Sequence, residues 1–220
     1  MAGRDTAKFY ADQERRVAPG HLDFALTHGG ESIHDAAAAT GDYVEALLAS
    51  GRDCTGSDLN GEYVAIAQAR GLPVVTADAS ALDMSDNSVD SVLLFEILEH
   101  IAASGTRRAV LTEARRVARS QVLITVPNST HLELLSTMGL TYEHMLDRDH
   151  KVFYTEETLR ADLEPVFSDF HLEPREELVE RMLPSLVRGF SRPRVAADIT
   201  PRMIKRPIHF RFYVRAAASS

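Results

Sequence analysis

The chain has 220 residues and a net charge of −8, with 45% hydrophobic and 25% charged residues. This composition excludes collagen-like and disordered chains, and a single cysteine, Cys54, excludes an internal disulfide framework. The acidic balance disfavours nucleic acid as a partner, because such binding depends on neutralised phosphates. We find no apolar run long enough for a membrane span and no export signal, so we expect a cytoplasmic protein with no membrane partner.

The chain begins with two predicted helices, over residues 4–16 and 21–27, separated by Pro19-Gly20. From residue 32, short apolar runs alternate with helical segments, which indicates βαβ units and a parallel sheet. The expected strands are 32–36, 53–58, 73–76, 90–95 and 121–126; the expected helices are 42–49, 62–70, a segment through residues 99–101, and 107–118.

The regular alternation ends after Asn128. Residues 129–150 are rich in His, Met, Leu and Tyr without clean periodicity, which suggests an insertion or lid. Thr155 is expected to cap a helix that runs to Leu163. Residues 166–172 and 208–214 are expected to form an antiparallel pair, with a helix over 176–190 between them. The fold class is therefore α/β: a doubly wound, Rossmann-like, seven-stranded mixed sheet of five parallel strands and a C-terminal antiparallel pair, with helices on both faces.

Acidic residues stand at the ends of the first three predicted strands, and in open parallel sheets ligands bind beyond these carboxyl ends. Asp35 precedes a run of very small residues, 36–41, whose backbone a ligand can approach closely. Asp58 is placed to accept hydrogen bonds from both ribose hydroxyls of a nucleoside. Asp78 and Ala79 follow the third strand and can receive the amine of adenine. Together these residues predict a nucleoside site.

These motifs resemble the class I S-adenosylmethionine-dependent methyltransferases, in particular the type 11/12-like small-molecule enzymes with Leu-Glu-His after the fourth strand. The resemblance is best over residues 30–130, and segments 113–117, 123–128, 150–155 and 210–214 also resemble the family. It implies that S-adenosylmethionine is the cofactor, leaving as S-adenosylhomocysteine. The residues it implies for cofactor binding are Asp35, Ala37, Ala39, Gly41, Asp58, Leu59, Asp78, Ala79 and Phe95.

The glycine loop departs from the family pattern at Ala39, which occupies the second glycine place. If that place needs a positive φ, the methyl group costs about 1 kcal/mol. We expect one methyltransferase domain over residues 1–220. Its parts are N-terminal helices (1–29), a cofactor-binding half (30–128), a lid or substrate insertion (129–155) and C-terminal helices and strands (156–220).

Methyl transfer chiefly needs alignment of two partners and exclusion of water. A hydroxyl acceptor also benefits from a general base, for which His144 and His150 in the lid are the candidates. Tyr142 and Tyr154 are candidates for orienting the acceptor, and packing of the lid explains all four residues equally well. No metal is predicted, because the histidines and aspartates of the lid fit no helix face.

The predicted acceptor is a small natural product or metabolite methylated on oxygen or nitrogen. It can be anionic, because residues 175–220 hold 10 Lys and Arg against 4 Asp and Glu, although solvated surface and salt bridges explain this charge as well. A homodimer is left open. One alternative is a degenerate methyltransferase fold that acts as a binding or scaffolding partner. Another is a nicotinamide-dependent dehydrogenase, although the chain lacks Gly-x-Gly-x-x-Gly.

Overall fold

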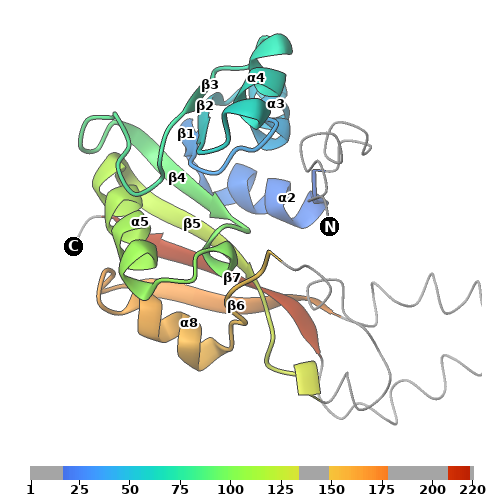
Figure 1. Cartoon of the computed structure of the whole chain (residues 1–220), viewed down its shortest axis with the longest axis vertical. Coiled ribbons are helices and arrows are strands. Elements are labelled where there is room, and N and C mark those ends of the chain that lie inside the picture. Colours follow the sequence, from blue (N-terminus) through green and yellow to red (C-terminus); the bar gives the residue numbers. More distant parts are fainter. Residues whose placement is uncertain (1–16, 134–148, 178–207, 219–220) are drawn as a thin grey trace, which may run out of the picture.

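The computed structural model describes residues 17–133, 149–177 and 208–218. Their strands form one seven-stranded sheet in the order β3-β2-β1-β4-β5-β7-β6 (Figure 1). Strands β1 to β5 are parallel, and β7 runs antiparallel to both of its neighbours, which confirms the predicted mixed sheet. The strands are β1 (Ser32–Asp35), β2 (Asp53–Asp58), β3 (Val74–Thr76), β4 (Val89–Phe95), β5 (Ala118–Pro127), β6 (Phe170–Glu177) and β7 (His209–Ala217).

The helices of the described residues have local signals at their ends. Gly41, at φ 82°, precedes α3, Asn60 caps α4 by accepting a hydrogen bond from the amide of Glu62, and Thr155 and Thr158 form a capping box on α8. None of these helices is long and apolar enough to cross a membrane. They are α2 (Pro19–His28), α3 (Asp42–Ala49), α4 (Gly61–Ala69), the 3₁₀ turn η1 (Leu98–His100), α5 (Ser104–Val117) and α8 (Glu156–Leu163).

Two hydrophobic cores cover the two faces of the sheet. Side chains alternate along a strand, so Val92 and Leu94 face one core while Leu93 between them faces the other. The first core is closed by α5 and α8, and the second by α2, α3 and α4 (Figure 1). Each fully buried Leu or Val contributes about 1.5–3 kcal/mol of transfer free energy. This burial fixes the strand ends that carry the polar side chains.

Three expected elements differ in the structure. The segment through residues 99–101 is the short 3₁₀ turn η1 rather than a helix. The sixth strand begins at Phe170, because Val166 and Phe167 are buried in the core behind α8. Residues 176 and 177 belong to that strand, so the helix predicted from 176 is wrong at its start. The predicted helix over 4–16, residues 178–190 and most of the predicted lid lie outside the described residues.

Candidate active site

The backbone turns sharply after β1. The amide of Ala38 donates to the carbonyl of Ser57 in β2 at 2.9 Å, which draws the loop across the end of the sheet. Gly41 has φ 82°, a left-handed conformation that favours glycine, and a Cβ there would lie 2.7 Å from Cδ1 of Leu72 and 3.2 Å from Cβ of Ala67, so a larger residue would be both strained and crowded. Ala39 has φ 44°. The positive φ expected for the second glycine place is therefore present, and Ala39 adopts it at a cost of about 1 kcal/mol.

Asp58 at the end of β2 is hydrogen-bonded to this loop. Its Oδ2 accepts from the amide of Ala39 at 2.9 Å and its Oδ1 accepts from the amide of Asn60 at 2.8 Å. Leu59, the next side chain, is 72% exposed although it is large and apolar. The loop after β1, the acid and an exposed apolar surface thus lie together at one edge of the sheet.

Asp35 lies beneath the same loop and is 1% exposed. Burial raises the pKa of its carboxyl to about 7, although a hydrogen bond from the amide of Ala37 opposes this shift. The negative charge of Asp58 raises the pKa further. Asp35 is therefore poised to gain or lose a proton near neutral pH, and a positive charge placed nearby would favour its ionised form.

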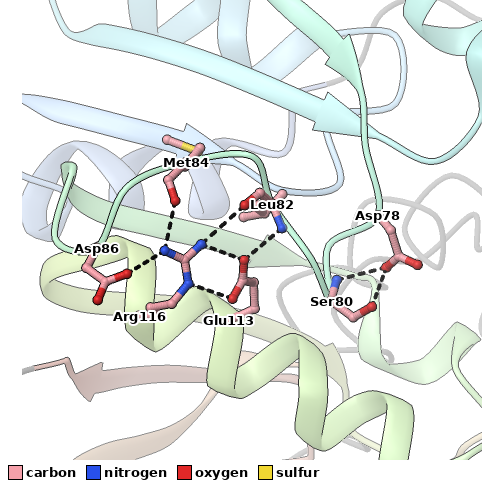
Figure 2. A network of polar contacts seen from close by, with 7 residues as sticks. All are labelled: Asp78, Ser80, Leu82, Met84, Asp86, Glu113 and Arg116. Atoms are coloured by element: carbon pink, nitrogen blue, oxygen red, sulfur yellow. Dashed lines mark hydrogen bonds and ion pairs between the residues drawn. The ribbon is translucent and has the colours of Figure 1, made fainter.

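Asp78 follows β3 and is exposed. Its Oδ1 accepts from the amide and the hydroxyl of Ser80, at 2.8 and 2.7 Å (Figure 2). These bonds hold the pKa of Asp78 below its usual range, so the side chain is a fixed anion. Ala79 beside it is buried against the core.

Two residues of α5 hold the loop that follows Ala79 (Figure 2). Glu113 accepts from the amide of Leu82 at 2.7 Å, and Arg116 donates to the carbonyls of Leu82 and Met84. Arg116 also pairs with Glu113 and Asp86. The loop is therefore anchored to a helix that packs on the opposite side of β4 and β5 from α2 and α3.

Phe95, at the end of β4, is 6% exposed and lies in an aromatic group. Its ring centroid is 5.2 Å from that of His21 and 5.6 Å from that of Tyr43. The hydroxyl of Tyr43 is 2.8 Å from Nδ1 of His21. The aromatic group joins α2 and α3 to the end of β4, so Phe95 packs on protein in this structure, and its contact with a cofactor stays a prediction.

Glu96 follows Phe95 with φ 53°, an uncommon backbone conformation for this residue type. Its carboxylate accepts from Nε of Arg211 in β7 at 3.0 Å, and Arg211 also donates to Glu176 in β6 at 2.5 Å. The Arg211 side chain is only 10% exposed. This ion-pair network connects the antiparallel strands to the carboxyl end of the parallel strands.

The segment that contains His150 is fastened to η1. The amides of Lys151 and Val152 both donate to the carbonyl of Glu99, at 2.7 and 3.0 Å. The rings of His150 and His100 lie 4.7 Å apart, nearly perpendicular. His150, a candidate base, therefore lies beside the turn that follows β4, although it is 50 positions away from His100 in the chain.

Tyr154 is 1% exposed, and its hydroxyl donates to Asp162 at 2.8 Å. This position favours packing over a contact with an acceptor. The other candidates for acceptor contact and base, Tyr142 and His144, lie outside the described residues.

Residues 34–126 match the sequence model of a family described as a methyltransferase domain. The match runs from β1 to β5 and includes Asp35, Asp58 and Asp78. Over these residues the chain is similar to a methyltransferase domain. Every residue predicted to bind the cofactor lies within this domain. No curated protein matches the chain significantly in sequence.

Solved structures of methyltransferases share the fold of this chain. A SAM-dependent methyltransferase from Archaeoglobus fulgidus has a TM-score of 0.71 and 20% identity, covering 97% of this chain and 100% of that one. Phosphoethanolamine N-methyltransferase 2 from Haemonchus contortus, in complex with S-adenosylmethionine, has a TM-score of 0.59 and 16% identity, covering 96% of this chain and 56% of that one. Magnesium protoporphyrin IX methyltransferase from Synechocystis, with bound S-adenosylhomocysteine, has a TM-score of 0.58 and 16% identity, covering 91% and 81%.

Sequence reasoning missed His21, Tyr43 and Arg211 as neighbours of the site. They come from three separate segments, and no local pattern connects them. The alternation of residues in the last strand was the only available signal, since it puts Arg211 on the face opposite Phe210 and Phe212. The sheet order places β7 beside β5, which brings Arg211 near the carboxyl end of β4, while His21 and Tyr43 reach the same end from α2 and α3.

Proposed function

We propose that the methyltransferase domain transfers the methyl group of S-adenosylmethionine to oxygen or nitrogen of a small-molecule acceptor. The observation that carries this proposal is the hydrogen bond between Asp58 and the amide of Ala39, which joins the acid after β2 to the tight loop after β1. Asp58 would hold the ribose hydroxyls and the loop from Asp35 to Gly41 the methionine part. Asp78 with Ala79 would contact adenine.

The residues present fit this ligand. An ionised carboxylate offers about four acceptor positions, and the backbone amides of Ala39 and Asn60 use two of those of Asp58. Two positions therefore remain for a pair of ribose hydroxyls. Leu59 beside them exposes an apolar side chain that a planar base can cover. When bound, the cofactor supplies a methyl group on a positively charged sulfur, and the protein's part is to align and shield it.

The acidic net charge of −8 supports a small molecule over nucleic acid as acceptor. For a hydroxyl acceptor, His150 is the described candidate base, and His144 and Tyr142 stay proposals from the sequence. An anionic acceptor, a homodimer and a cytoplasmic location also stay predictions.

Calorimetry with S-adenosylmethionine tests the proposal. We expect one site per chain, with a dissociation constant on the order of micromolar, and product inhibition by S-adenosylhomocysteine. Absence of heat and of a thermal shift at about 1 mM cofactor would instead favour the alternative, a protein of this fold that binds or scaffolds a partner without methyl transfer.

Replacing Ala39 by glycine is expected to leave cofactor affinity unchanged or to improve it. Glycine adopts φ 44° without the steric cost of a methyl group, and the amide that donates to Asp58 is kept. We expect the melting temperature to be equal or higher. The release of about 1 kcal/mol of backbone strain stabilises the folded state, and it offsets the larger conformational entropy that glycine gives the unfolded chain. Calorimetry and thermal melts measure both effects. A marked loss of affinity would show that the methyl group itself contacts the cofactor.

Cofactor binding is expected to weaken as the pH falls below 7. The carboxyl of Asp35 has a pKa of about 7 in the free protein, so it is ionised above this pH and neutral below it. A cationic ligand favours the ionised form and lowers that pKa, so binding is strongest where Asp35 is already ionised. Affinity should therefore fall by up to about tenfold per pH unit below 7.

This expectation is checked by cofactor titrations at several pH values between roughly 5.5 and 8, a range that extends about one unit or more to each side of the shifted pKa. Asp35→Asn is the control. The amide variant cannot ionise, so its affinity should be lower and independent of pH. A wild-type affinity that is constant over this range would show that Asp35 is not near the cofactor's positive charge.

A further inference from the structure

Glu99, His100 and His150 form a cluster of metal-binding side chains at the turn after β4. One carboxylate oxygen and one nitrogen from each ring all lie within 4.8 Å of one another. The Glu99 side chain is buried, His100 is exposed and His150 is half-buried, so the cluster lies at the surface end of a buried acid.

The backbone fixes the positions of all three residues. Glu99 and His100 lie within η1, and two amides that follow His150 donate to the carbonyl of Glu99. Nδ1 of His100 is 3.2 Å from the carbonyl oxygen of Asp149, the residue before His150. The two segments are thus bonded on both sides of His150, and the donors are held together by main-chain contacts.

The contact with Asp149 also selects the tautomer of His100. A backbone carbonyl only accepts hydrogen bonds, so Nδ1 carries the proton and the lone pair is on Nε2. Metal-binding histidines usually donate their second ring N–H to a carbonyl or carboxylate in this way. His100 therefore has the arrangement of a metal ligand.

Resting on the proposed function, we propose that Glu99, His100 and His150 bind a divalent transition-metal ion such as Zn²⁺, which binds an oxygen of the acceptor. Two imidazoles and one carboxylate suit such ions, and sites with three protein ligands keep a further position open. Bond lengths near 2.1 Å place the ligand atoms of a tetrahedral site about 3.4 Å apart, so side-chain atoms that now lie within 4.8 Å of one another would move together by roughly 1 Å. The sequence predicted no metal, because the histidines and aspartates of the lid fit no helix face, and that prediction did not consider Glu99 and His100 together with His150.

The place of the cluster suits an acceptor site. η1 directly follows β4, and β4 pairs with β1, whose end carries the predicted cofactor loop. An ion that binds an acceptor hydroxyl lowers its pKa, so that its proton passes to water more readily. His150 would then act as a ligand rather than as the general base, which is a different role for the same residue.

The proposal is tested by titration with Zn²⁺ and Co²⁺. The protein for this titration carries no polyhistidine tag and is first treated with a chelator. We expect one ion per chain with a dissociation constant below about 10 µM, and Co²⁺ should give the visible absorption of a bound ion. His100→Ala is the first variant, because His100 is exposed and its loss should not disturb folding. Glu99→Gln and His150→Ala follow. Each should weaken binding at least about tenfold.

His171→Ala is the matched control, since His171 is 63% exposed on β6 and outside the cluster. It should bind the ion like the wild type. Wild-type affinity weaker than about 1 mM, or equal affinity in His100→Ala and the wild type, would overturn the proposal and leave the two rings as a packing pair. S-Adenosylmethionine affinity, measured separately on the same proteins, should stay within about twofold. If the wild type does not bind the cofactor, the proposed function is refuted but the ion site is not, because ion binding does not depend on cofactor binding.

Discussion

Asp58→Ala is expected to weaken S-adenosylmethionine binding at least about tenfold. The substitution removes the acceptor for the ribose hydroxyls and also the acceptor for the amide of Ala39. Hydrogen bonds to a charged group contribute about 1.5–3 kcal/mol, so loss of one of them already reaches this factor. The Asp58 side chain is only partly buried at the end of β2, so the sheet should remain folded. Calorimetry gives the affinity and circular dichroism the fold.

Two further variants separate the causes. Asp58→Asn keeps one carbonyl oxygen as an acceptor and should lose less affinity than the alanine variant. Glu62→Ala removes a nearby exposed acid in the first turn of α4 and should have no effect, since no cofactor contact is predicted for it. Unchanged affinity in Asp58→Ala would remove the main support for the nucleoside site.

The parallel half of the fold was predictable because its signals are local. The continuous apolar run of Val92, Leu93 and Leu94 indicates a strand buried on both faces, and the small residues after Asp35 indicate a turn. The ends of β2 and α3 fall at the predicted residues. By contrast, residues 170–177 include Pro174 and several charged residues, which do not favour a strand. They pair as the edge strand because β7 supplies hydrogen bonds, and Pro174 is tolerated at an edge.

The candidate site also has residues that the sequence could predict and contacts that it could not. Asp35 and Asp58 were predictable because parallel strands of regular spacing end at one edge of the sheet. The bond between Glu96 and Arg211 was not, because it joins residues 115 positions apart. The contact of His150 with η1 likewise depends on main-chain bonds between distant segments. Sequence periodicity shows which face a residue occupies and cannot show which remote segment meets it there.

Arg107→Met is expected to lower the free energy of unfolding by about 3–5 kcal/mol. Arg107 is 9% exposed and donates to Asp162 in α8, at 2.6 Å from Nε. It also donates to the carbonyls of residues 101 and 102, which directly follow η1. Methionine fills a similar volume but leaves the carboxylate of Asp162 without its cation in a partly buried place. Urea denaturation measures the change.

Arg160→Met is the matched control on the same helix. Arg160 pairs with Glu156 on the exposed surface of α8, and such pairs contribute about 0–1 kcal/mol. A similarly small loss for Arg107→Met would show that water reaches Asp162 and that the ion pair does not fix the segment after η1.

Tyr154→Phe tests whether Tyr154, which contacts the ion pair of Arg107 and Asp162, has a packing role or orients the acceptor. The hydroxyl of Tyr154 donates to the Asp162 oxygen that Arg107 also contacts, so its loss should cost only about 1 kcal/mol while Arg107 still compensates the charge. A packing role predicts this loss of stability with no change in KM for the acceptor, whereas a residue that orients the acceptor would raise KM. Because the hydroxyl is buried and already bonded, we expect the first outcome, and the stability losses of Tyr154→Phe and Arg107→Met should then be non-additive in the double variant.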